Sequence, residues 1–196
     1  MFYYNTMNNQ QAIVKSFNTV LEMLKDRKVD VSNINQTIVT ESLVKSSLSS
    51  VSFKIQIENI NIVYYLATKF RWPDMKKIVE EGLDPSLMYM FIVNDKISLN
   101  NMKSINALAI NYQIFNIKEL QFNITKHILV PKHEKVDEAH VKEILDTFSL
   151  KTKFQLPLIL KTDPMSRYLG LKGGDVIKVT RNSPSSGEYF VYRCCM

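Results

Sequence analysis

Residues 163–181 read DPMSRYLGLKGGDVIKVTR and decide the fold of the C-terminal part of the chain. Asp163 and Pro164 are typical of a helix start, because an Asp side chain can cap the first turn and proline has no N–H that would be left unpaired there. Gly170 is typical of the residue that follows the end of a helix. The stretch therefore predicts a helix of two turns, followed by Gly173-Gly174 and a strand.

A β-hairpin is predicted after this helix. Asp175–Arg181 and Tyr189–Cys194 each alternate apolar and polar residues, which is the pattern of half-buried strands. Residues 182–188, NSPSSGE, are turn formers and predict the loop between the strands. Gly173-Gly174 superficially resembles a phosphate-binding loop, but the Lys-Ser/Thr that would complete the motif is absent and a strand follows. The pair therefore predicts a tight turn into the hairpin.

The residues before this region complete a small domain, predicted to cover residues 124–196. His127–Pro131, with the sequence HILVP, predicts a strand that is stopped by proline. Asp137 predicts the cap of a helix whose apolar residues recur at helical spacing, namely Val141, Ile144, Leu145 and Phe148. A mixed α+β domain follows from this order of elements.

Residues 1–123 alternate predicted helices and strands. Ala12–Asp26 carries apolar residues at steps of three and four, which predicts a helix with one buried face. Val51–Ile57 alternates apolar and polar residues and predicts a strand. The same criteria predict strands over 62–67, 87–93 and 108–115, and helices from Pro73 to Glu81, ended by Gly82, and from Ser98 to Asn106. Such alternation indicates an α/β domain.

Composition and charge are those of a globular protein, with 45% hydrophobic and 22% charged residues. The net charge of +6 fits an acidic partner such as nucleic acid, but no run of basic residues is longer than a pair, so a solvated basic surface is the alternative. Neither a signal peptide nor an apolar run of membrane-spanning length is found, and we expect a soluble intracellular protein.

Reactive side chains form no recognisable constellation in the sequence. The three histidines, His127, His133 and His140, match the spacing of neither a zinc-binding helix nor a zinc finger. Cys194 and Cys195 are adjacent, a geometry in which a mutual disulfide is strained, and they lie at the end of a predicted strand. We expect both to be buried, and we expect no catalytic residue, metal or cofactor.

Longer motifs give the chain a family resemblance. His127–His133, HILVPKH, is followed by Leu156-Pro157, by Asp163–Arg181 and by Ser183–Arg193. This order and spacing resemble the fifth common subunit of eukaryotic RNA polymerases I, II and III, whose C-terminal domain stands alone as a small subunit of the archaeal polymerase. The N-terminal half resembles the jaw domain of the eukaryotic subunit more loosely, through Phe17–Arg27 and Met102-Lys103.

The resemblance implies an α/β N-terminal jaw-like domain (1–123) and a small mixed α+β C-terminal assembly domain (124–196). In that family the C-terminal domain docks on the largest polymerase subunit, and the jaw domain extends towards downstream duplex DNA. The implied partners are therefore other polymerase subunits and DNA, with no membrane, small-molecule substrate or cofactor. A free-standing basic nucleic-acid-binding protein with the same fold is the alternative.

Candidate site residues follow from the resemblance. For the partner interface we select Arg167, Tyr168, Lys172 and Arg193, since Arg and Tyr are enriched at the energetic centres of interfaces. Arg167 and Tyr168 have the alternative of covering the domain's own core. The DNA-proximal candidates are Lys96, Ser98 and Lys103, for which a solvated loop is the alternative.

The family's Thr-Pro before the last helix of the jaw domain corresponds here to Ser98-Leu99. This change, the shortened N-terminal domain and the richness in Asn, Ile and Lys favour a copy from a large DNA virus. Its location would then be the virion or a cytoplasmic viral factory, whereas a cellular copy would be nuclear.

Overall fold

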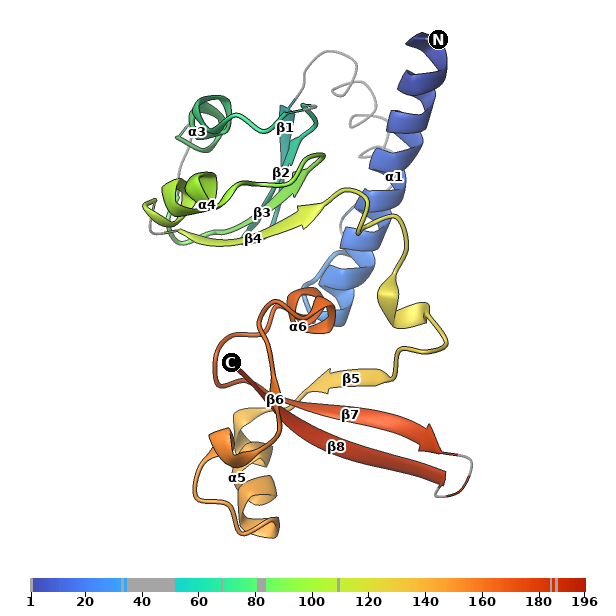
Figure 1. Cartoon of the computed structure of the whole chain (residues 1–196), viewed down its shortest axis with the longest axis vertical. Coiled ribbons are helices and arrows are strands. Elements are labelled where there is room, and N and C mark those ends of the chain that lie inside the picture. The colour runs from blue at the N-terminus through green and yellow to red at the C-terminus, as the bar shows by residue number, and fades with distance from the viewer. Residues whose placement is uncertain are drawn as a thin grey trace. The chain divides into compact units, whose positions relative to one another are not determined.

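The chain folds into two compact units, Met1–Phe122 and Asn123–Met196, in the computed structural model (Figure 1). The structure describes residues 2–32, 34, 52–67, 69–80, 84–108, 110–183, 185 and 187–196. None of the helices in this described part is long and apolar enough to cross a membrane.

The first unit contains a four-stranded sheet in the order β1-β2-β3-β4. Its strands are β1 (Ser52–Ile57), β2 (Ile60–Tyr65), β3 (Met88–Val93) and β4 (Asn111–Asn116). β1 pairs antiparallel with β2, whereas β2, β3 and β4 are parallel. Parallel neighbours need crossover connections, and these contain α3 (Trp72–Glu80) and α4 (Leu99–Asn106).

Helices cover both faces of this sheet (Figure 1). On one face, Val63 and Tyr65 of β2 belong to a buried cluster with Met75 and Val79 of α3 and Ile105 of α4. On the other face lies α1 (Phe2–Asp26), whose apolar stripe is buried at Ile13, Phe17, Val20, Leu21 and Leu24. Because successive side chains of a strand point to opposite faces, all six residues of β2 are buried between these helices.

The second unit contains a four-stranded sheet in the order β5-β7-β8-β6. Its strands are β5 (Lys132–Lys135), β6 (Leu158–Ile159), β7 (Val176–Ser183) and β8 (Gly187–Cys195). β7 pairs antiparallel with both β5 and β8, and the short β6 runs parallel to β8. Two short 3-10 helices, η1 (Ile124–Lys126) and η2 (Lys153–Gln155), accompany the sheet.

The β7–β8 hairpin separates two small cores in this unit. Val176 and Cys194 belong to a cluster with Val141 of α5 (Glu138–Thr147). Their neighbours Ile177 and Cys195 belong to a second cluster with Leu171, which follows α6 (Pro164–Leu169). The two helices therefore lie on opposite sides of the sheet (Figure 1).

Most predicted elements are confirmed, with shifted ends. The helix predicted over Ala12–Asp26 begins earlier, at Phe2, and the strand and helix predictions of the α/β region agree with β1 to β4, α3 and α4. Val51, Glu81 and Gly82 lie outside the described residues. α6 has the predicted caps at both ends, because the Asp163 side chain accepts a hydrogen bond from Met165 N and Gly170 has a left-handed φ of 66°.

The strand predicted at His127–Pro131 is wrong. These residues form a turn in which Val130 N donates to His127 O over 2.9 Å, and strand β5 begins only after Pro131. Ile128 and Leu129 therefore belong to neither of the two sheets that the structure describes.

Two further predictions need smaller corrections. The hairpin loop is shorter than residues 182–188, because Ser183 still pairs with Gly187. Asp137 occupies the cap position of α5 as predicted, but its side chain makes no capping hydrogen bond.

Candidate interaction surfaces

Two of the predicted interface residues, Arg167 and Tyr168, lie on helix α6. Asp163 Oδ1 accepts a hydrogen bond from Met165 N over 2.8 Å, and Leu171 N donates to Ser166 O over 2.9 Å, so both ends of this short helix are held. Arg167 is half-buried in the last turn, and Tyr168 is only 4% exposed. A side chain that is buried to this extent has little surface for contact with a partner. Its burial favours the alternative interpretation, that Tyr168 covers the core of its own domain.

Lys172 and Arg193 lie on separate segments. Lys172 is exposed in the turn before β7, where Asp175 Oδ2 accepts hydrogen bonds from Lys172 N (2.8 Å) and from Lys135 Nζ (2.7 Å). Arg193 on β8 donates from Nη1 to Leu158 O over 3.0 Å and so links β8 to β6. Lys172 is thus available at the surface, whereas Arg193 already has a structural role within the sheet.

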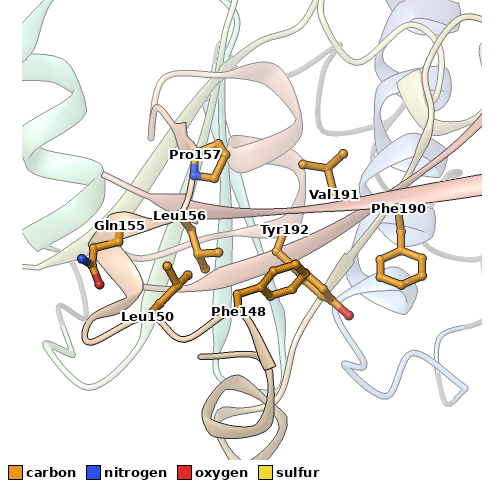
Figure 2. Close-up of a pocket in the computed structure, with 8 residues that line it drawn as sticks. All are labelled: Phe148, Leu150, Gln155, Leu156, Pro157, Phe190, Val191 and Tyr192. Atoms are coloured by element: carbon orange, nitrogen blue, oxygen red, sulfur yellow. The ribbon is translucent and has the colours of Figure 1, made fainter. Parts of the chain in front are cut away.

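A groove that the sequence did not indicate lies beside β8. It has a volume of about 350 Å³ and is lined by Phe148, Leu150, Gln155, Leu156, Pro157, Phe190, Val191 and Tyr192 (Figure 2). Phe148 and Phe190 are 54% and 51% exposed. Seven of these eight residues are apolar, so the groove suits an apolar occupant.

Aromatic contacts hold one wall of the groove. The Tyr192 ring lies with its centroid 6.1 Å from Phe148 and 5.6 Å from Phe190, both in edge-on arrangements. Lys178 Nζ lies 4.5 Å from the centroid of the Phe190 ring, a cation–π distance. These contacts fix the positions of large side chains that remain partly open to solvent.

A second exposed apolar feature is the turn after η1. Ile128 is 95% exposed and Leu129 is 81% exposed. The turn is held by the backbone N–H of Leu129, which donates to His127 Nδ1 over 3.2 Å. Two adjacent apolar side chains are therefore presented outward by a defined local structure.

The DNA-proximal candidates lie on α4 and on the residues just before it. Ser98 is the N-cap, and its Oγ accepts a hydrogen bond from Asn101 N over 3.4 Å. The helix thus begins with a serine cap. Lys96 lies two residues before the cap and Lys103 lies in the last turn, and both are exposed.

The side chains that could take part in a reaction, those of Cys194, Cys195 and His133, are buried or half-buried. Cys194 and Cys195 are free thiols and are buried, and burial raises the pKa of each. Half-burial lowers the pKa of His133, although a hydrogen bond from Nδ1 to Pro131 O (2.7 Å) opposes this shift. Within the described ranges, no three His, Cys, Asp or Glu residues are placed to hold a metal ion.

Comparisons with known proteins place these surfaces in context. Residues 122–195 match the family model described as RNA polymerase Rpb5, C-terminal domain. The chain is 31% identical over 186 residues to the DNA-directed RNA polymerases I, II, and III subunit rpabc1 of Dictyostelium discoideum, which covers 91% of this chain and 94% of that protein.

Two further relatives differ in how much of the chain they match. The DNA-directed RNA polymerases IV and V subunit 5B of Arabidopsis thaliana is 28% identical over 90% of this chain and 86% of its own length. The DNA-directed RNA polymerase subunit Rpo5 of Pyrococcus horikoshii is 44% identical over 73 residues, which are 37% of this chain and 88% of that subunit.

Proposed function

The chain belongs to the Rpb5 family of DNA-directed RNA polymerase subunits, and we propose that it is a non-catalytic subunit that docks on the largest subunit through Asn123–Met196. The observation that carries this proposal is the match to a eukaryotic relative over 91% of the chain and 94% of that protein, which includes both units. The archaeal relative matches only 37% of the chain, at higher identity. The family model covers residues 122–195, and the eukaryotic and archaeal relatives are both polymerase subunits. The second unit is therefore our candidate for the docking unit.

Affinity purification tests this proposal directly. The tagged full-length chain, purified from its source cells, is expected to recover the largest polymerase subunit in stoichiometric amounts and to keep it through a high-salt wash. Recovery of the tagged chain alone under gentle conditions would contradict the proposal. If the isolated chain instead binds duplex DNA with an affinity that falls steeply with salt, the free-standing DNA-binding alternative applies.

We further propose that Met1–Phe122 lies near downstream DNA in the assembled enzyme. Lys96 and Lys103 support this role, since both are exposed, Lys96 just before α4 and Lys103 in its last turn, and lysines contact phosphates without reading bases. The location of the protein follows from the enzyme it serves, the nucleus for a cellular polymerase and the virion or viral factory for a viral one.

Charge reversal in the assembled polymerase tests the DNA contact. The double variant Lys96→Glu, Lys103→Glu is expected to reduce photo-crosslinking between this subunit and downstream duplex DNA without loss of the subunit from the enzyme. Lys25→Glu is the control, because Lys25 is exposed on α1, on the opposite face of the sheet from α4. Equal crosslinking by the wild type and the double variant would exclude these lysines from the contact.

A further inference from the structure

One backbone edge of β8 is open over Glu188–Tyr192 in the part of the chain that the structure describes. β7 pairs with β8 along Gly187–Cys194 and covers the other edge completely. On the open side, β6 pairs only with Cys194 and Cys195. An uncovered edge presents unpaired N–H and C=O groups and is a template for another strand.

The hydrogen bonds at the end of β8 show which residues face the open edge. Cys194 N donates to Pro157 O and Met196 N to Ile159 O, so even-numbered residues face the β6 side. Cys195 N donates to Asp175 O, so odd-numbered residues face β7. Because N–H and C=O directions alternate along a strand, the backbone groups of Glu188, Phe190 and Tyr192 point outward at the open edge.

The apolar groove lies along this same edge. Its lining includes residues from both faces of β8, with Val191 on one side and Phe190 and Tyr192 on the other, as Figure 2 shows. The opposite wall is the segment from Phe148 to Pro157, where the salt bridge between Lys153 and Glu138 (2.9 Å) ties η2 to α5. The outward N–H and C=O groups of β8 and the apolar groove therefore lie along the same edge of the sheet.

We propose that the open edge of β8 accepts an extended segment of the largest polymerase subunit as an added strand, with apolar side chains of that segment in the groove. This inference rests on the proposed function and specifies the surface through which docking occurs. An extended segment is required because only a strand can pair with the outward N–H and C=O groups. The open stretch of five residues spans roughly 16 Å, enough for a short strand.

The chemistry of the lining specifies the occupant further. Apart from the Tyr192 hydroxyl, Gln155 carries the one polar side chain of the lining, and its Oε1 already accepts hydrogen bonds from Lys151 N (2.6 Å) and Thr152 N (3.1 Å). The lining contains no charged side chain to recognise a charged occupant. The bound segment is therefore expected to carry apolar residues at alternate positions, since alternate side chains of a strand share one face.

Residue-resolved amide hydrogen exchange tests the inference without any substitution. The full-length chain is measured alone and in complex with the co-expressed largest subunit. The amides of Phe190 and Tyr192 are expected to exchange fast in the free chain and at least about tenfold more slowly in the complex, since they gain hydrogen bonds. The Val191 amide, already paired with β7, is expected to be slow in both.

Matched substitutions at Phe190 separate the backbone contribution from that of the side chain. Phe190→Ala and Phe190→Pro both remove the aromatic ring, but only proline removes the outward N–H and adds a ring at the edge. Proline is tolerated at an edge position whose N–H faces solvent, so the two variants are expected to melt alike. Phe190→Pro is expected to bind the largest subunit about tenfold more weakly than Phe190→Ala.

The outcomes distinguish this inference from the proposed function. A wild-type chain that fails to bind the largest subunit overturns both. Binding with unchanged exchange at Phe190 and Tyr192, or with equal affinity of the two variants, overturns only the added strand. Slow exchange at these amides in a free chain that forms dimers assigns the edge to a second copy and likewise overturns the inference.

Discussion

Tyr64 shows at the scale of one residue how α1 is attached to its sheet. Its side chain is fully buried, and its hydroxyl lies 3.0 Å from Ser16 Oγ on α1. Burial raises the pKa of Tyr64 well above the ordinary value of 10.0, because the phenolate would lose its hydration, although the hydrogen bond with Ser16 opposes the shift. The folded state therefore keeps this phenol neutral at a pH where the unfolded chain ionises it.

This shift predicts a loss of stability at alkaline pH. A group whose pKa is raised on folding contributes its full stability below the unfolded pKa, here near 10.0, and loses it as the pH rises further. Above that value the contribution of Tyr64 to the free energy of unfolding falls by about 1.4 kcal/mol per pH unit. Tyr64→Phe removes this part of the pH dependence.

Denaturant unfolding of wild type and Tyr64→Phe at neutral and at alkaline pH measures the effect. Near neutral pH the variant is expected to be less stable by about 1 kcal/mol, since the hydrogen bond with Ser16 is lost. Above the unfolded pKa the difference is expected to shrink or reverse. A constant difference across the whole range would show that Tyr64 ionises equally in both states.

At the scale of one element, α6 depends on the residue that ends it. Gly170 has a φ of 66°, in the left-handed region, and its N–H donates to Arg167 O over 3.2 Å. A side chain in this conformation costs about 1 to 2 kcal/mol. Gly170→Ala is therefore expected to lower the free energy of unfolding of the second unit by that amount.

Gly173→Ala is the matched control for this prediction. Gly173 does not have a positive φ, and a Cβ there would meet only the flexible end of Lys161, at 3.1 Å from Nζ. Thermal and denaturant unfolding are expected to show a small effect for Gly173→Ala and a clear loss for Gly170→Ala. Equal losses would mean that local crowding and not backbone conformation governs this region.

The same elements show what could be predicted from sequence and what could not. Helix α6 was predictable because its start and end depend on local chemistry, that of Asp163, Pro164 and Gly170. The strand predicted at His127–Pro131 failed because an apolar run does not reveal whether a neighbouring strand is present. Pairing is a tertiary property.

The candidate site was less predictable than the fold. Phe148 was placed on the buried face of its helix by spacing, yet it follows the last helical residue and is 54% exposed. The groove joins Phe148, Pro157 and Phe190, which are far apart in sequence, so no local pattern could indicate it. Tyr168 was selected by residue type, and its burial became visible only in three dimensions.

At the scale of the whole molecule, the three buried clusters described above each consist of residues from one unit. The cluster around Phe91 contains only residues of Met1–Phe122, and those around Ile177 and Val176 contain only residues of Asn123–Met196. The archaeal relative, which matches 37% of the chain and 88% of its own length, corresponds in size to the second unit alone. These observations predict that the second unit folds independently.

A fragment of residues 123–196 tests this expectation. It is expected to unfold cooperatively on heating, as followed by circular dichroism, and to give dispersed amide resonances, because all members of its two buried clusters lie within the fragment. A disordered fragment alongside a full chain that unfolds in a single transition would show that the second unit needs the first.

The turn at Ile128 and Leu129 has a consequence for the life of the protein in the cell. Two adjacent apolar side chains, 95% and 81% exposed, are the kind of feature that chaperones and proteases recognise on an unassembled subunit. We predict that a surplus copy is short-lived, so its abundance follows the supply of its partners and not its own rate of synthesis.

Pulse-chase labelling of the overexpressed chain measures this turnover. Co-expression of the largest subunit is expected to lengthen the half-life, and the double variant Ile128→Ser, Leu129→Ser is expected to lengthen it without any partner. A half-life that responds to neither change would mean that this turn is no degradation signal. If both changes act as expected, the turn that was predicted to be a strand also limits the amount of unassembled subunit. The cell then holds about as many copies of this subunit as there are polymerases to receive them.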